Sequence, residues 1–277
     1  MLNVDLHCHS SVSDGVMAPS EVAARAKANG VDVWALTDHD EVGGIAEARA
    51  AARTLDLDYV AGVEISATWA GHTLHIVGLH IDETNEALIQ GLATTRTGRT
   101  RRAREIALEL EKAGIPDAYE GALKFVGNPD LISRMHFARY ISELGICASP
   151  AEVFSRFLTS GKPGFVPHRW ASLTDALKWI HDAGGISVMA HPGRYKLSDI
   201  EFGALFDEFK QLGGMAIEVT TGSHSVDQYA QYAEIARQYE FLASRGSDFH
   251  GPGESRVDLG NLPPLPSGVK PVWHNWV

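Results

Sequence analysis

Cysteine is nearly absent from this sequence: its 277 residues contain only two, Cys8 and Cys147. Two cysteines so far apart cannot form a disulfide framework, which favours a reducing compartment and predicts a cytoplasmic location. The chain also lacks any apolar run of the roughly 18 to 20 residues that a transmembrane helix needs. Its first residues show no basic segment followed by an apolar one. We therefore expect neither a signal peptide nor association with a membrane.

Positive charge is also in short supply. The sequence has 24 Lys and Arg against 35 Asp and Glu, a formal net charge of −11. This balance argues against a protein that binds long nucleic acid through bulk charge. It still allows a small anionic substrate held at one locally positive site. Histidine, by contrast, is abundant: its 13 copies are about twice the number that an average usage of about 2% would give.

Short apolar runs alternate with amphipathic helical patterns along most of the chain. Near-continuous apolar runs are typical of strands covered on both faces in a parallel sheet, and their alternation with helices indicates βα units in an open sheet or a barrel. We expect strands at residues 3–6, 33–37, 59–63, 73–79, 186–190, 215–219 and 241–245, and helices at residues 19–28, 45–55, 173–183, 200–212 and 226–239.

The alternation breaks in the middle of the chain, where the patterns are helical and no strand is evident. We expect one helix at residues 102–112, a second starting at Asn128 and a third starting at Ser149, each of the last two preceding a proline. These patterns predict a small helical subdomain inserted into the α/β domain. We place the two parts of the α/β domain at residues 1–95 and 165–277, and the insertion at residues 96–164.

Many histidines and several carboxylates lie at or next to the expected strand ends. Because the carboxyl ends of parallel strands converge on one face, where active sites are built, we expect these side chains to meet. His7 and His9 are two residues apart in an extended segment and leave the same face, whereas Cys8 points to the other. The complete set of expected ligands is His7, His9, Asp14, His39, Glu64, His75, His191, Asp248 and His250.

Imidazole together with carboxylate is a ligand set for zinc, manganese or iron(II), and it argues against calcium, which takes oxygen ligands. Nine donors are too many for one tetrahedral ion and suit two or three divalent ions with one bridging carboxylate. Taken singly, each residue has an ordinary structural explanation: Asp14 precedes Gly15 and suits a turn, and Asp248 could cap a helix. The prediction depends on the agreement of all the strand ends.

All of these ligand positions except His75 fall in six short motifs, which occur in this order along almost the whole chain: His7-Cys8-His9, Ser13-Asp14-Gly15, Thr37-Asp38-His39-Asp40, Gly62-Val63-Glu64, Ala190-His191-Pro192 and Ser247-Asp248-Phe249-His250. They resemble the motifs of the PHP (polymerase and histidinol phosphatase) family. The resemblance implies an α/β fold, a distorted seven-stranded (β/α)7 barrel, with a centre of two or three metal ions that hydrolyses phosphate esters. We expect Mn²⁺, with Zn²⁺ or Fe²⁺ as alternatives.

The resemblance also implies how the ligands divide. One ion would take His7, His9, Glu64 and Asp248; a second would take Asp14, His39 and His250; a third would take Glu64, His75 and His191, with Glu64 as the bridge. The catalytic set would then be His7, His9, Glu64, Asp248 and His191. A hydroxide bridging two ions would attack phosphorus in line. The group that protonates the leaving oxygen stays open.

A phosphate ester also needs positive groups that metal ions do not supply. Arg102 lies at the border of the apolar side of its expected helix, next to Ala103. Arg134 and His136 follow the expected helix start at Asn128, and a helix N-terminus with an arginine nearby suits a phosphate group. The expected substrate contacts are Arg134, Arg102, Ala103, His136, Arg169 and Arg194.

Residues 127–136 and 165–167 are similar to one PHP subgroup, which removes the 3′-phosphate from nucleoside 3′,5′-bisphosphates such as pAp; some members trim short RNA from the 5′ end. Asp130 departs from that subgroup, where histidine is common at this place. Our first hypothesis is therefore a bisphosphate phosphatase that yields a nucleoside 5′-monophosphate and phosphate. The alternatives are a 5′→3′ exoribonuclease on short oligonucleotides, a histidinol phosphate phosphatase, a C–N amidohydrolase on a related barrel, and a metal-stabilised scaffold without catalysis.

Overall fold

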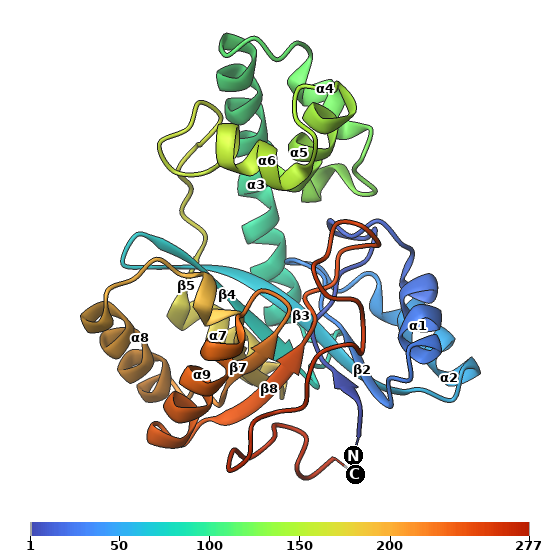
Figure 1. The fold of residues 1–277 in the computed structure, drawn as a ribbon, viewed down its shortest axis with the longest axis vertical. Coiled ribbons are helices and arrows are strands. Elements are labelled where there is room, and N and C mark those ends of the chain that lie inside the picture. Colours follow the sequence, from blue (N-terminus) through green and yellow to red (C-terminus); the bar gives the residue numbers. More distant parts are fainter. Residues whose placement is uncertain (1, 277) are drawn as a thin grey trace.

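Seven strands form a nearly closed barrel in the computed structural model, which describes residues 2–276 (Figure 1). Their hydrogen-bonded order is β1-β2-β3-β4-β6-β7-β8, and the short β5 pairs with β3. The Leu6 amide donates to the Arg245 carbonyl (3.0 Å), which links the first strand to the last. The strands are β1 (Val4–Asp5), β2 (Val33–Leu36), β3 (Asp58–Trp69), β4 (His72–Leu79), β5 (Ala171–Ser172), β6 (Ile186–Met189), β7 (Ala216–Thr221) and β8 (Leu242–Gly246).

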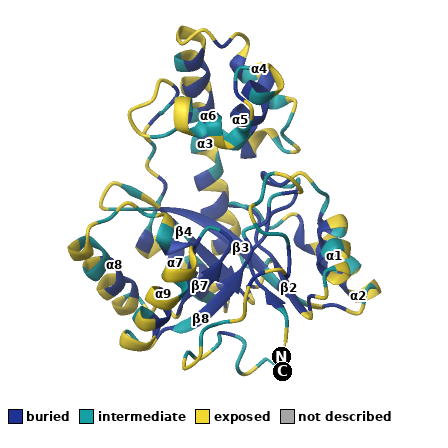
Figure 2. Ribbon diagram, in the orientation of Figure 1, coloured by how far each residue is buried: buried dark blue, intermediate teal, exposed yellow. Residues whose placement is uncertain are grey.

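Helices on the outside of the barrel cover the strands, which are buried (Figure 2). These helices are α1 (Pro19–Ala28), α2 (Ile45–Thr54), α7 (Leu173–Asp182), α8 (Asp199–Gln211) and α9 (Val226–Gln238). Each lies within a residue of the range expected from the sequence, because the apolar periodicity and the caps agree. Ser172, Ser198 and Ser225, for example, each accept a hydrogen bond from an amide of the first turn that follows.

The fourth strand corrects the expectation of an all-parallel barrel. β4 runs antiparallel to both of its neighbours, β3 and β6. β3 continues to Trp69, six residues past its expected end, and turns directly into β4 through Ala70 and Gly71, whose φ angles are 46° and 83°. A two-residue connection of this kind joins antiparallel strands, whereas parallel strands need a crossover of a dozen or more residues.

A helical cap stands above one end of the barrel (Figure 1). It consists of the second half of α3 (Glu86–Lys112) with α4 (Ala118–Leu123), η1 (Pro129–Leu131), α5 (Arg134–Glu143), α6 (Pro150–Val153) and η2 (Phe154–Leu158). α3 is longer than the helix expected at residues 102–112 and crosses the expected boundary at residue 95. Its Leu88 and Leu92 belong to the barrel core, whereas Ala103 and Leu110 belong to a separate core inside the cap. Within residues 2–276, no helix is both long and apolar enough to cross a membrane.

The helix expected to start at Asn128 begins six residues later. Asn128 caps only the three-residue 3₁₀ turn η1. The backbone is extended again at Ser133, whose hydroxyl accepts a hydrogen bond from the Met135 amide (3.2 Å) and caps α5. Arg134 is therefore the first residue of a helix, at an end where backbone amides favour anions.

Candidate metal centre and phosphate site

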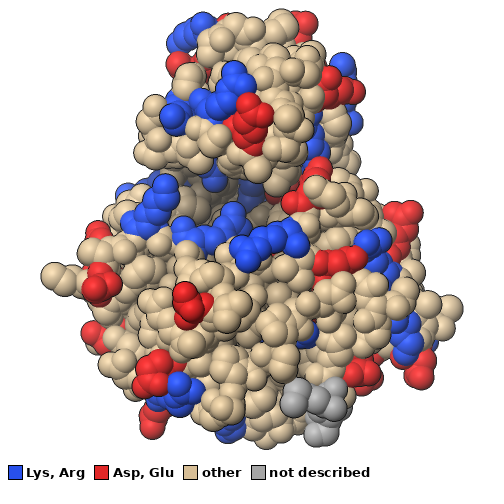
Figure 3. Space-filling model, in the orientation of Figure 1, with Lys and Arg blue, Asp and Glu red and all other residues tan. Residues whose placement is uncertain are grey.

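A cavity of about 370 Å³ lies between the cap and the barrel. Lysine and arginine side chains gather along the hollow below the cap (Figure 3). The barrel contributes seven of the expected ligands to the lining, and the cap contributes arginines and apolar side chains. The lining includes Asp14, His39, Glu64, His75, His191, Asp248 and His250 from the barrel, and Arg99, Arg102, Ala103, Ile106, Ile132, Arg134, Met135, Phe137 and Phe154 from the cap and α3.

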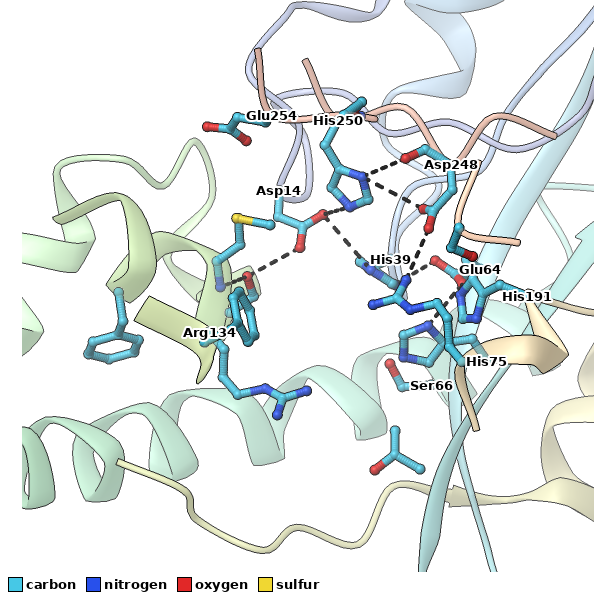
Figure 4. A pocket seen from close by; sticks show the side chains of 18 of the residues that line it. Asp14, His39, Glu64, Ser66, His75, Arg134, His191, Asp248, His250 and Glu254 are labelled. Carbon is cyan, nitrogen blue, oxygen red and sulfur yellow. Dashed lines mark hydrogen bonds and ion pairs between the residues drawn. The ribbon is translucent and has the colours of Figure 1, made fainter. Parts of the chain in front are cut away.

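All nine expected ligands meet at this end of the barrel, and most of them are seen in Figure 4. Their nitrogen and oxygen atoms form four overlapping groups, with the donor atoms of each group within 4.8 Å of one another. The groups are His9, Asp14, His39 and His250; His7, His9 and Asp248; His7, Glu64 and His191; and His39, Glu64 and His75. These groups overlap more than the division that the family resemblance implies, because His7, His9 and His39 each belong to two groups.

Glu64 lies at the centre of the cluster and is fully buried. One of its carboxylate oxygens, Oε2, lies 3.3 Å from both His7 Nε2 and His9 Nε2 and 3.0 Å from His39 Nδ1. The other, Oε1, lies 2.9 Å from His75 Nδ1 and 3.0 Å from His191 Nε2. A carboxylate that faces five imidazoles has the position of a bridging ligand.

Two of the ligands reach the site from inside a strand. Glu64 is in the middle of β3, since that strand continues to Trp69. His75 lies opposite Ser66 of β3, in the first half of the antiparallel β4. Because β4 runs against its neighbours, its amino-terminal half lies at the face where the parallel strands end. The rule that ligands follow strand ends does not account for His75, which lies inside its expected strand; the antiparallel direction of β4 explains its position.

Six buried nitrogen and oxygen atoms in the cluster have no hydrogen-bond partner: His9 Nδ1, Asp14 Oδ1, His39 Nδ1, Glu64 Oε2, His75 Nδ1 and His191 Nδ1. Buried polar atoms without a partner are rare and costly. Their concentration among imidazoles and carboxylates is what a site for divalent metal ions requires. The residues present therefore fit such ions.

The carboxylates depend on positive charge nearby. Burial acts to raise the pKa of Glu64, but His39, His7 and the other imidazoles outweigh it and hold that pKa well below its usual range. Burial lowers the pKa of His9, yet Asp248 and Glu64 outweigh this and raise it to about 10. The protein alone thus balances its buried carboxylates with imidazole protons. Divalent ions among these donors would take the place of the protons.

Glu218 is a buried partner of the ligands that the sequence analysis did not identify. This β7 residue accepts a hydrogen bond from the His191 backbone amide (Oε2, 2.6 Å), and its Oε1 lies 2.7 Å from His7 Nδ1. The contact orients the His7 ring so that Nε2 faces Glu64, which is the usual function of a carboxylate behind a metal-binding histidine. The signal in the sequence was a single carboxylate inside an otherwise apolar strand.

Other buried carboxylates hold the loops that carry the ligands. Asp38 accepts hydrogen bonds from the Ser10 amide (2.8 Å) and the Ser13 hydroxyl (2.6 Å), which orders the loop that leads to Asp14. Asp5 accepts hydrogen bonds from the amides of Ser247 and Gly260, both at 2.8 Å, beside Asp248.

Arg102 and Arg134 face the cavity without a carboxylate partner in the described part of the chain. Arg102 Nε donates to the Val166 carbonyl (3.0 Å) and Arg134 Nη1 to the Leu158 carbonyl (3.2 Å). Burial, followed by repulsion from Arg134 and Arg99, lowers the pKa of Arg102 to about 9. Burial is also the largest cause of the lowered pKa of Arg134. Both side chains are half-buried. Partly buried cations without a counter-ion are costly, and an anion in the cavity would relieve that cost.

Two other arginines near the cavity are already paired, whereas Arg256, which also lines it, is exposed. Arg99 contacts Asp40 through its guanidinium, and Arg194 Nη1 lies 3.0 Å from Asp248 Oδ2. Of the other expected substrate contacts, Ala103 lines the cavity, but His136 and Arg169 do not. His136 is buried, and its Nδ1 accepts a hydrogen bond from the Ser133 amide (2.9 Å). Arg169 is exposed, because its neighbour Trp170 is the residue that turns inward.

Comparison with known proteins supports the same interpretation. A PHP domain model matches residues 5–128. The chain is 47% identical over 273 residues to the 3′,5′-nucleoside bisphosphate phosphatase of Chromobacterium violaceum, covering 99% of this chain and 96% of the relative. It is 42% identical over 274 residues to the 5′-3′ exoribonuclease Rnm of Escherichia coli, covering 98% of this chain and 93% of the relative.

A solved structure shows the same fold. It is described as an amidohydrolase from Chromobacterium violaceum with bound sulfate and no metal, and it matches with a TM-score of 0.95 at 47% identity, covering 98% of this chain and 94% of that chain. The two named relatives above both hydrolyse phosphate esters. The similarity runs over nearly the full length of the chain, and the chain therefore belongs to the PHP family, as a hydrolase of phosphate esters.

Proposed function

We propose that this protein removes the 3′-phosphate from nucleoside 3′,5′-bisphosphates such as pAp, yielding a nucleoside 5′-monophosphate and phosphate. One observation carries the proposal. Arg102 and Arg134 are half-buried cations without carboxylate partners in the described part of the chain, and they line the same cavity as the cluster of expected metal ligands. A substrate with two phosphate groups matches both ends of the cavity, whereas a simple monoester leaves the arginines unmatched.

The nine expected ligands and the two arginines have different roles in this proposal. Divalent ions held by the nine donors, with Mn²⁺ expected and Zn²⁺ or Fe²⁺ as alternatives, supply a Lewis acid for the phosphoryl oxygens and activate water. His7, His9, Glu64, His191 and Asp248 form the catalytic set that holds them. Arg102 and Arg134 bind the 5′-phosphate and keep the nucleotide in position.

The cap also offers an apolar wall for the nucleoside. Ile106, Ile132, Met135, Phe137 and Phe154 line the cavity near the two arginines. Aromatic and aliphatic surfaces of this kind bind flat ring systems through burial of apolar area.

Both cysteines are free and buried, which suits the reducing cytoplasm where nucleotides are metabolised.

The purified protein with Mn²⁺ should convert pAp to equal amounts of inorganic phosphate and 5′-AMP. Chromatography of the nucleotide product distinguishes 5′-AMP from 3′-AMP and identifies the phosphate that leaves. Histidinol phosphate serves as the comparison substrate because it has one phosphate group. Release of phosphate only from such monoesters would exclude the proposal.

A 5′→3′ exoribonuclease acting on short RNA is the second candidate. Its support is the similarity to the Escherichia coli exoribonuclease, which is nearly as high as that to the phosphatase and covers almost the same length, together with the basic hollow in Figure 3. A 5′-phosphorylated dinucleotide tests it. A higher kcat/KM for release of the first nucleotide than for dephosphorylation of pAp would favour the exoribonuclease.

A further inference from the structure

Helix α5 of the cap is tied directly to the loops that carry two of the expected metal ligands. Ser133, its N-cap, donates a hydrogen bond from Oγ to Asp14 Oδ2 (3.2 Å). Arg139, farther along the same helix, donates from Nη2 to the Asp14 carbonyl (2.6 Å). Arg139 also forms a bidentate pair with Glu254, with Nε–Oε1 at 2.8 Å and Nη2–Oε2 at 2.7 Å.

Glu254 lies on the loop that follows His250. The Ser255 hydroxyl in that loop accepts a hydrogen bond from the His250 amide (2.7 Å). Glu254 is near Asp14 and His250 in Figure 4. Arg139 thus contacts the Asp14 loop directly and the His250 loop through Glu254. Asp14 and His250 belong to the same group of donors, and their side chains are 3.4 Å apart at Oδ1 and Nε2.

Phosphate binding does not account for Arg139. Its side chain is 7% exposed, it does not line the cavity, and its charge is already matched by Glu254. Burying an arginine and its carboxylate partner carries a free-energy penalty for removing both charges from water, and only good hydrogen-bond geometry offsets that penalty. The bidentate geometry and the carbonyl contact meet that condition. The contact is therefore a built connection between cap and barrel.

We propose that Arg139 is a positioning residue that couples the position of the cap to occupancy of the divalent metal site formed around Asp14 and His250. The cap is also joined to the barrel by α3, whose Arg99 contacts Asp40. The Arg139 contact is a second connection between cap and barrel. Arg134, at the start of the same ten-residue helix, lies in the cavity. A ligand that draws Arg134 into place therefore also holds the Asp14 and His250 loops.

The substrate half of this inference rests on the proposed function, whereas the metal half does not. Two variants break the contact from opposite sides: Arg139→Gln and Glu254→Gln. Arg156→Gln is the matched control, since Arg156 pairs with Glu152 within the cap (3.0 Å) and touches no barrel loop. Arg139→Lys keeps the charge but not the bidentate geometry.

Calorimetric titration with Mn²⁺ is the main readout, carried out with and without 5′-AMP. We expect Arg139→Gln and Glu254→Gln each to weaken Mn²⁺ binding by about tenfold or more, the usual effect of losing an outer partner of a metal ligand. Arg139→Lys should lie between these variants and the wild type, and Arg156→Gln should match the wild type. In the wild type 5′-AMP should tighten Mn²⁺ binding. This coupling should shrink in both variants because each breaks the contact between α5 and the ligand loops.

Folded variants, identified by their melting curves, with wild-type Mn²⁺ affinity would overturn the inference. A lower melting temperature with unchanged Mn²⁺ affinity would show a merely structural contact and would overturn it too. If Arg139→Gln does not fold, Glu254→Gln carries the test. Weakened Mn²⁺ binding in a protein that does not hydrolyse pAp would refute the proposed function while supporting the positioning role.

Discussion

Replacing Arg102 by methionine should stabilise the protein while damaging its binding of substrate. Arg102 is a half-buried cation whose pKa is lowered to about 9, first through burial and then through Arg134 and Arg99. At pH 7, which is below this lowered pKa, the full penalty of the partly buried charge is present. It would fade only as the pH rises above about 9. Methionine keeps much of the apolar stem without the charge.

The magnitude follows from the contacts. The drop in pKa corresponds to at most about 5 kcal/mol, and water in the cavity screens part of it. The substitution also loses the hydrogen bond to the Val166 carbonyl, worth about 1 kcal/mol, and the stacking of the guanidinium over Trp170, 5.3 Å from the ring centroid, worth about 0.5–1 kcal/mol. The expected net gain is about 1–3 kcal/mol, or roughly 2–6 °C in Tm.

Substrate binding should change in the opposite direction. A charge-assisted hydrogen bond to phosphate is worth about 1.5–3 kcal/mol, so KM for pAp should rise roughly 10- to 150-fold. Thermal melts at pH 7 and steady-state kinetics with pAp measure the two effects. Inorganic phosphate should raise the Tm of the wild type more than that of the variant.

Arg101→Met is the control, because Arg101 is the neighbouring residue on α3 and its side chain is 76% exposed. It should leave both Tm and KM nearly unchanged. The reasoning fails if Arg102→Met is less stable than the wild type and binds pAp equally well. That result would mean that Arg102 is compensated within the protein and is not held ready for an anion.

Three further experiments examine the metal centre. Glu218→Gln removes the charged partner of His7 and should weaken Mn²⁺ binding by about 10- to 100-fold; equal affinity in a calorimetric titration would rule out a role for Glu218 in orienting that ring. Removal of metal with a chelator should abolish turnover and lower Tm. Mn²⁺ at about 100 times its Kd should restore about 2.7 kcal/mol of stability. A Tm that the chelator does not change would contradict a metal bound at the buried cluster. Asp248 and Glu64 outweigh burial and raise the pKa of His9 to about 10, so Mn²⁺ binding at pH 8 should release protons and strengthen as the pH rises. Calorimetry in buffers of different ionisation enthalpy should show this proton release. Binding without proton release would contradict the protonated state of His9.

The positions of the expected ligands were readable from the sequence because position and residue type agreed. His7 and His9 follow a short strand two residues apart, and Asp248 and His250 repeat that spacing after the last strand. Parallel strands that alternate with helices bring such ends together whatever the details of packing. The outer helices were predictable for a similar reason, since their caps and apolar faces are local features.

Features that depend on the direction of a strand or on a distant partner were not readable in the same way. The strand that carries His75 was expected to be parallel, and its reversal depends on a two-residue turn after Trp69. Glu218 has the sequence surroundings of a core strand, and only its contact with His7 shows its role. Asn128 has the pattern of a helix start but caps a single 3₁₀ turn.

The arginines show most clearly which features the sequence predicts and which only the tertiary structure decides. The sequence by itself predicted that an acidic chain places nine expected metal ligands at one face and carries several arginines in an inserted helical segment. It could not rank those arginines, because each has a similar local pattern. Only the tertiary structure decided that Arg99, Arg139 and Arg194 are paired with carboxylates from other elements, whereas Arg102 and Arg134 are half-buried with no carboxylate partner among residues 2–276. Whether a charge is compensated depends on contacts between residues far apart in the chain, and local sequence does not encode those contacts.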